Sequence, residues 1–168
     1  MPDKKTLERA EQDRLEGKAP STQAGEFVRE EMEHIREGKH GARSTKQAIA
    51  IGLSKARRAG VKLPPPKEGT VSERTRRSAQ LEREAGERGD TQVSPTRSRA
   101  ISRVLKHEGH SAASKSALAK QAHSAARRRT PAERSAAAKK AARTKGPVGR
   151  SLAARKAART RARGHTGS

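Results

Sequence analysis

The chain of 168 residues contains no cysteine, no tryptophan and no tyrosine, and Phe27 is its single phenylalanine. Without cysteine, disulfide bonds and thiolate-bound zinc are excluded. With almost no aromatic rings, sites that stack bases on aromatic side chains are unfavourable, including RNA-recognition sheets and single-strand-binding platforms. These shortages remove whole classes of site before any motif is considered.

Large apolar residues are also scarce. Leu, Ile, Val and Phe together make up 19 of the 168 residues. This share of about 11% is well under the roughly 20% below which a highly charged chain tends towards disorder. No apolar run approaches the ~18 residues of a membrane span, and the first residues alternate acids and bases without a secretory apolar region. We expect a cytoplasmic protein, located in the nucleoid of a bacterium, with no membrane partner.

Acidic residues are nearly missing from the last third. Residues 111–168 contain sixteen Lys and Arg but one acid, Glu133, and carry +15 of the chain's net charge of +22. The same stretch holds eighteen alanines and only three larger aliphatic residues. Because such a stretch cannot build a core, we predict that its partner is a polyanion. Duplex DNA is favoured, since neutralising phosphates releases condensed counterions.

Helical periodicity predicts an all-α fold, with small helical hairpins and an extended, partly disordered helical tail rich in Ala, Lys and Arg. Five parts are expected. They are a charged helix and linker (1–20), a helical hairpin module (21–63), a polar linker with an exposed helix (64–93), a second, weak helical pair (94–129) and a basic repeat tail (130–168).

The hairpin module is the one place where two apolar stripes can cover each other. Ser21 or Thr22 would cap its first helix, and Ser44 its second. The core is thin, because each buried large side chain contributes only roughly 1.5–3 kcal/mol. A homodimer through residues 21–63 would therefore add stability, although the sequence does not require one.

Later helices are predicted from their first residues. Thr70 and Glu73 have capping-box spacing, and Ser94-Pro95 combines an N-cap with a first-turn proline. Thr130-Pro131-Ala132-Glu133 combines all three signals. The helix that it begins is expected to end before Gly146-Pro147.

The basic tail contains an internal repeat. Residues 135–144 read SAAAKKAART and residues 151–160 read SLAARKAART, so eight of ten positions match at a period of sixteen. Alanine favours the helix, whereas like charges four apart, such as Lys139 and Arg143, oppose it by about 0.2–0.5 kcal/mol per pair. We therefore expect the tail to gain helicity when phosphates remove the repulsion.

The candidate nucleic-acid-binding residues are the bases of the C-terminal segments: Arg127, Arg128, Arg129, Lys139, Lys140, Arg143, Arg155, Lys156, Arg159, Arg161 and Arg163. The second hairpin helix is loosely similar to a helix-turn-helix recognition helix, although its bases at 57–62 could simply complement the helix dipole. It contributes four secondary candidates: Lys46, Lys55, Arg57 and Arg58.

No catalytic residue, cofactor, metal site or small-molecule substrate is predicted. His107-Glu108-Gly109-His110 lacks the histidine that a zinc-protease motif has at its fifth position. Glu30 and His34 are one helical turn apart and could bind a metal, but such a pair is more often a solvated helix face, which is the interpretation we favour. An enzyme also needs a closed pocket, for which the chain has little apolar material. We expect a protein that is not an enzyme.

Residues 46–66, KQAIAIGLSKARRAGVKLPPP, resemble the signature of a family of small, uncharacterised basic bacterial proteins that often carry the name DNA-binding protein by inference. The resemblance covers roughly residues 21–68 and is most specific over 44–61. The tail is similar in composition to linker-histone tails and bacterial histone-like proteins. The resemblance implies a bacterial, cytoplasmic protein associated with nucleic acid, and it supplies no catalytic residue or cofactor.

These observations favour a nonspecific DNA-binding, nucleoid-associated, histone-like protein. Two alternatives stay open. One is an RNA- or ribosome-associated basic protein, whose binding would also depend on phosphates. The other is a stress-related protein-interaction adaptor, in which the hairpin is the active part and the tail serves solubility or localisation.

Overall fold

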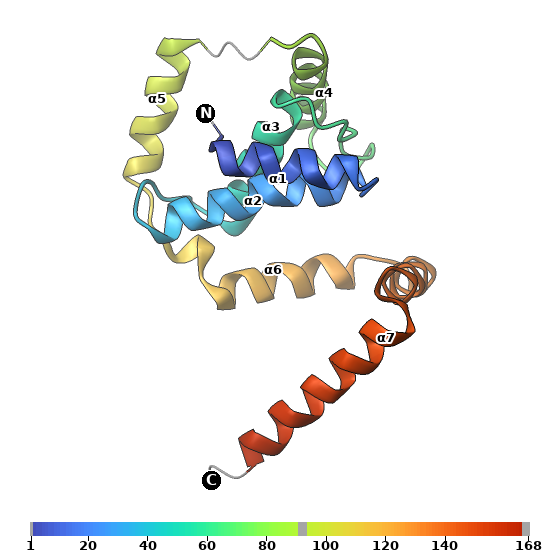
Figure 1. The fold of residues 1–168 in the computed structure, drawn as a ribbon. Coiled ribbons are helices and arrows are strands. Elements are labelled where there is room, and N and C mark those ends of the chain that lie inside the picture. The colour runs from blue at the N-terminus through green and yellow to red at the C-terminus, as the bar shows by residue number, and fades with distance from the viewer. Residues whose placement is uncertain (1, 91–93, 166–168) are drawn as a thin grey trace. The chain divides into compact units, whose positions relative to one another are not determined.

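The computed structural model describes residues 2–90 and 94–165, with side chains described through residue 162. All regular elements in these ranges are helical (Figure 1), which confirms the all-α prediction. In chain order they are α1 (Lys4–Leu15), α2 (Pro20–Arg36), α3 (Thr45–Arg58), α4 (Glu73–Glu87), α5 (Pro95–Lys106), the short 3-10 helix η1 (Ser111–Ala113), α6 (Lys115–Arg127) and α7 (Pro131–His165).

Residue contacts divide the chain into two compact units. The N-terminal unit comprises Met1–Gln121 and the C-terminal unit comprises Ala122–Ser168, so the division falls inside α6. None of the helices in the described part of the chain combines the length and the apolar character that crossing a membrane requires.

The predicted hairpin of α2 and α3 forms the centre of the N-terminal unit. Phe27 and Ile35 of α2 are 1% and 0% exposed, and Ala48 and Ala56 of α3 are fully buried. A Cβ atom added at Gly52 of α3 would lie 2.7 Å from the Cα atom of Val28. The two helices therefore touch almost backbone to backbone, and a core with few large side chains can still close.

Two flanking elements cover the ends of the hairpin core. α1 packs on α2 and contributes Ala10 to the cluster around Phe27. η1 contributes Ala112 and Ala113 to the cluster around Ile35. The hydroxyl of Thr45 donates a hydrogen bond to the Ala112 carbonyl oxygen at 2.7 Å. Burial of the hairpin faces is thus achieved within one chain and does not depend on the homodimer considered for residues 21–63.

α4 packs on α3, whereas the sequence predicted an exposed helix in a polar linker. Ala79 is buried at the contact, and the Glu82 carboxylate accepts a hydrogen bond from the Ser54 hydroxyl at 2.7 Å. Leu81, a large apolar residue of α4, is 56% exposed. Docking through a small residue and a carboxylate leaves no apolar stripe in the sequence, which is why the periodicity did not reveal it.

α5 and α6, which the sequence assigned to a second helical pair, do not pack side by side in the part of the chain that the structure describes. α5 is joined to the loop before α3 through its C-terminal backbone. The amide of Gly41 donates to the Leu105 carbonyl oxygen at 2.8 Å, and the amide of Ala42 donates to that of Gly109 at 3.0 Å. Ile101 and Val104 are 52% and 59% exposed. Backbone pairing thus holds α5 where apolar packing was expected.

Three helix starts follow the predicted caps. The hydroxyl oxygens of Ser44, Ser94 and Thr130 each accept a hydrogen bond from the amide three residues later. Glu133 completes the capping box, because its carboxylate accepts a hydrogen bond from the Thr130 amide at 2.9 Å. Local capping chemistry therefore fixes these boundaries.

Two other starts differ from the prediction. α2 begins at Pro20, ahead of the caps expected at Ser21 or Thr22, because proline is pre-organised for the first helical position. α4 is capped by Ser72 in place of Thr70, since the Ser72 hydroxyl oxygen accepts the amide of residue 75 at 3.3 Å.

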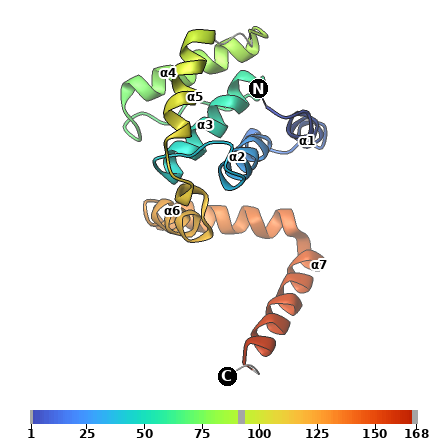
Figure 2. The same ribbon diagram turned by 90° about the vertical axis from the view of Figure 1, so that its left-hand side faces the viewer.

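In the C-terminal unit α7 is helical from Pro131 to His165 with one break. Gly146 adopts φ 65° and ψ 173°, and Pro147 begins the following segment, so the ribbon turns there (Figure 2). The partial disorder predicted for the tail is not confirmed. Eleven alanines in α7 outweigh the modest repulsion between like charges.

Candidate nucleic-acid interface

The C-terminal unit offers an exposed surface in which bases and alanines are the commonest residues. No described side chain between residues 122 and 162 is buried. Ten of the eleven primary candidates are exposed: Arg127, Arg128, Arg129, Lys139, Lys140, Arg143, Arg155, Lys156, Arg159 and Arg161. The eleventh, Arg163, lies within α7, but its side chain is outside the described residues.

The two halves of α7 repeat one arrangement of charge. Each half has three bases at helical spacings that place them on one face. They are Lys139, Lys140 and Arg143 before the break, and Arg155, Lys156 and Arg159 after it. Thr144 and Thr160 occupy matching positions, and each hydroxyl donates to the carbonyl four residues earlier at 3.0 Å. The repeat is thus present in the side-chain hydrogen bonds to the backbone as well as in the sequence.

Three further bases belong to the same surface and were missed by the sequence analysis. Arg134, Lys145 and Arg150 are exposed on α7. When only the positions of Lys and Arg are considered, the repeat extends to residues 134–145 and 150–161. Each of the five bases in the first copy has a base at the matching position of the second copy. Arg134 also donates to the Arg129 carbonyl oxygen at 2.7 Å, and Arg150 to that of Gly146 at 3.3 Å. These two side chains stabilise the starts of the helical segments.

The charge of the C-terminal unit has almost no internal compensation. Fourteen Lys and Arg share the unit with one carboxylate, Glu133, for a net charge of +13. One carboxylate cannot neutralise fourteen bases, so a strongly positive potential must surround the helices.

The secondary candidates on α3 are placed differently. Lys46 is exposed and Arg58 is half-buried. Lys55 Nζ lies 2.7 Å from Glu31 Oε2. Arg57 is 6% exposed, and its guanidinium lies 3.7 Å from the carboxylate of Glu82.

Burial lowers the pKa of Arg57, and the Glu82 carboxylate opposes that effect. Arg57 and Lys55 are therefore already paired inside the fold. Because α3 is also covered by both α2 and α4, it does not offer a free helix face for a DNA groove. The geometry gives no support to helix-turn-helix readout.

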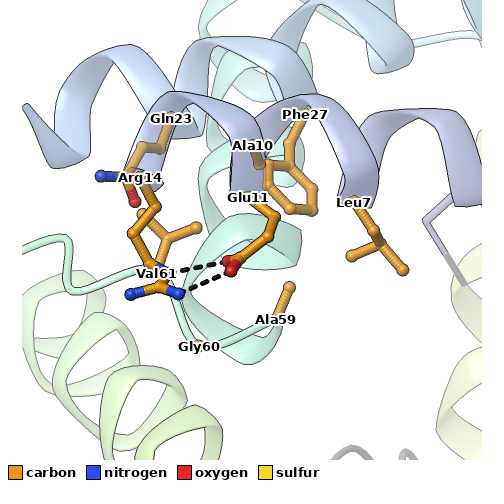
Figure 3. A pocket seen from close by; sticks show the side chains of 9 residues that line it. All are labelled: Leu7, Ala10, Glu11, Arg14, Gln23, Phe27, Ala59, Gly60 and Val61. Atoms are coloured by element: carbon orange, nitrogen blue, oxygen red, sulfur yellow. Dashed lines mark hydrogen bonds and ion pairs between the residues drawn. The ribbon is translucent and has the colours of Figure 1, made fainter. Parts of the chain in front are cut away.

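A small pocket lies between α1, α2 and the residues that follow α3 (Figure 3). Its volume is about 80 Å³, and its lining includes Leu7 and Phe27. At its edge the Arg14 guanidinium donates two hydrogen bonds to the Glu11 carboxylate at 2.7 and 2.5 Å. Ligand pockets usually enclose about 300–1,000 Å³, so this cavity is too small for an ordinary small-molecule substrate.

One group of side chains departs from the solvated helix face predicted for Glu30 and His34. Glu30 is 3% exposed and Glu31 is 0% exposed. They lie beside His34, His40 and Lys55, between α2, the loop that follows it, and α3. Glu30 faces α3, since its Oε1 atom lies 3.4 Å from Lys55 Nζ on that helix. These residues could hold a metal ion.

The comparisons with known proteins concern the hairpin alone. A protein-family model described as "Family of unknown function (DUF6496)" matches residues 19–67. Neither a curated protein nor a solved structure matches the chain. The matched range contains α2, α3 and the Glu30–Glu31 cluster and none of the primary candidate bases. It assigns no ligand to the chain.

Proposed function

We propose that this protein is a nonspecific, nucleoid-associated DNA-binding protein whose C-terminal unit contacts duplex phosphates. The observation that supports this proposal is the pair of matching basic faces on the two halves of α7, exposed and without enough carboxylate to neutralise them. A surface of this kind gains free energy when phosphates displace its counterions.

The mode of contact follows from the side chains on α7. Lys and Arg reach phosphate oxygens from a helix in which alanine is the commonest of the other residues. Small alanine side chains let the helix approach the duplex closely. The break at Gly146 lets each half follow the backbone separately. Phosphate contacts position a protein without reading base sequence, so similar affinity is expected for all duplexes.

The proposal is tested with two full-length variants of equal charge. In the tail variant six bases become glutamine: Lys139, Lys140, Arg143, Arg155, Lys156 and Arg159. In the control variant six exposed bases of the N-terminal unit become glutamine: Lys4, Lys5, Lys62, Lys67, Arg74 and Arg77. Binding to a duplex of random sequence is measured by fluorescence anisotropy over a range of salt concentrations.

The tail variant is expected to lose about 5 from the slope of log K against log salt, at roughly 0.9 per phosphate contact. The control variant should keep most of the native slope. Equal losses in both variants would show that net charge alone governs binding and would contradict the proposed interface. Structured RNA in a parallel titration distinguishes the duplex-DNA function from RNA association, which would be indicated by tighter binding to RNA at matched salt.

A further inference from the structure

The buried cluster of the N-terminal unit contains the donor types of a transition-metal site. One donor atom each from Glu31, His34 and His40 lies within 4.8 Å of the other two. A second such group, Asp3, Glu30 and His34, shares His34 with the first. Imidazole nitrogen combined with carboxylate oxygen is a donor set typical of Zn²⁺ and its neighbours in the first transition row.

Among the described residues, the Glu31 carboxylate is only partly partnered. Its side chain is 0% exposed, and neither carboxylate oxygen accepts an aligned hydrogen bond. Lys55 Nζ approaches Oε2 at 2.7 Å as an ion pair. Oε1 faces His40 Nε2 at 3.3 Å. A fully buried carboxylate is costly unless its charge is met, and among the described residues Oε1 has His40 beside it and no aligned hydrogen bond.

The second nitrogen of His40 supports the same inference. His40 Nδ1 lies 3.0 Å from the Gly41 carbonyl oxygen, which can only accept a hydrogen bond. Nδ1 therefore donates to that carbonyl oxygen, and Nε2 is the ring nitrogen that faces Glu31 Oε1. A backbone carbonyl that fixes the outer nitrogen is the usual arrangement behind a metal-binding histidine.

The spacing and charge of the group also suit a divalent ion. Two ligand atoms of a tetrahedral zinc site, each about 2.1 Å from the metal, are about 3.4 Å apart, close to the 3.3 Å between His40 Nε2 and Glu31 Oε1. The Asp3 and Glu30 carboxylates lie beside His34, and the Glu30 and Glu31 carboxylates lie beside the ammonium of Lys55. These three carboxylates supply negative charge for a divalent ion within a chain of net charge +22.

We propose that Glu31, His34 and His40 bind one divalent transition-metal ion, for which Zn²⁺ is the best match. Lys55 is a positioning residue, because it holds the far oxygen of Glu31 and leaves Oε1 for the ion. The ion would tie α2 to the loop that leads into α3. This site is independent of DNA binding, so its failure would leave the proposed function unaffected.

The test uses the full chain after treatment with EDTA. Calorimetric titration with Zn²⁺ is expected to show one saturable site per chain. Co²⁺ should give the visible d–d absorption of a site with nitrogen and oxygen ligands. A cluster that only stabilises the fold and binds no metal cannot produce this absorption. Mg²⁺, which prefers an all-oxygen octahedral shell, should not compete at similar concentrations. Competition by Mg²⁺ or the absence of a saturable Zn²⁺ site would overturn the proposal.

Variants locate the site. His40→Gln and His34→Gln each remove a proposed ligand and should weaken Zn²⁺ binding at least about 100-fold, more than the loss of an outer partner usually does. His123→Gln is the matched control, because His123 is exposed on α6. This variant should bind Zn²⁺ as tightly as the native chain does. Far-ultraviolet circular dichroism verifies that each variant is folded. If both ligand variants bind Zn²⁺ as tightly as the control, the proposal is wrong.

Discussion

The two units of this chain are both helical and both basic, yet they differ in how far their bases are paired with acids. The N-terminal unit has 26 Lys and Arg with 17 acids, and many of these form ion pairs, several across helices. The C-terminal unit has fourteen bases with one acid and no buried side chain among those described. The comparison shows that basic composition alone does not make a binding surface. In the C-terminal unit the bases have few acids to pair with and no core to enter.

The units also differ in what orders their helices. In the N-terminal unit Phe27 and Ile35 are fully buried, and alanines and glycines let the helices approach closely. In the C-terminal unit Val148 and Leu152 are 74% and 59% exposed. Helix order there depends on alanine propensity and local caps. Substitutions should therefore have separable effects on folding and on DNA binding.

The largest expected effect comes from removing residues 122–168. Because these carry the proposed phosphate contacts, duplex affinity should fall at least about 1,000-fold at low salt, the scale that six or more contacts supply. The thermal midpoint of the N-terminal unit should not change. Anisotropy and circular dichroism measure the two quantities. If residues 1–121 kept the native affinity, the division of roles between the units would be wrong.

The next effect tests which unit has a core. Phe27→Ala should lower the free energy of unfolding by about 3–5 kcal/mol, since it empties a fully buried site. Leu152→Ala is the control in the C-terminal unit, where an exposed side chain should matter by less than about 0.5 kcal/mol. Urea denaturation measures both. A comparable loss of unfolding free energy from Leu152→Ala would mean that α7 packs in a core, which would contradict the difference between the two units.

A glycine pair should change stability in opposite directions. A Cβ at Gly52 meets Val28 Cα at 2.7 Å, so Gly52→Ala should cost about 1–3 kcal/mol through overpacking. A Cβ at Gly149 lies 3.7 Å from Lys145 Cβ, an ordinary contact. Gly149→Ala should therefore favour its helix by up to about 1 kcal/mol. Denaturation midpoints check the first variant and helicity the second. Stabilisation by Gly52→Ala would contradict the close approach of α2 and α3.

The smallest effect concerns two caps. Ser44→Ala should lower the stability of the N-terminal unit by about 1 kcal/mol, because the Ser44 hydroxyl accepts the amide of Gln47. Thr130→Ala removes an equivalent bond from α7 and should reduce helicity without moving the unfolding midpoint. A shift of that midpoint by Thr130→Ala would mean that α7 unfolds together with the core.

The local features of this fold were predictable, and the long-range contacts were not. The hairpin and the caps at Ser44, Ser94 and Thr130 follow from periodicity and side-chain chemistry within a few residues. The insertion of η1 beside Ile35 joins positions 67 residues apart, as in the bond from Thr45 to Ala112. It is made by alanines, which carry no periodic signal, so the sequence alone could not reveal it.

The same distinction applies to the candidate sites. Composition and the sixteen-residue period were enough to propose the bases of α7. They were not enough to show that Lys55 and Arg57 are paired inside the fold, because their partners lie on α2 and α4. Glu30 and His34 looked like a solvated face for the same reason. Only the packing of α3 on α2 shows that the face is buried.

The central claim is most directly tested by the salt dependence of duplex binding by the native chain. If about half of the sixteen bases in residues 111–168 contact phosphates, log K should fall with log salt at a slope of about −7. The slope should be the same for duplexes of unrelated sequence. A slope shallower than about −3, or one that differs strongly between sequences, would contradict the account.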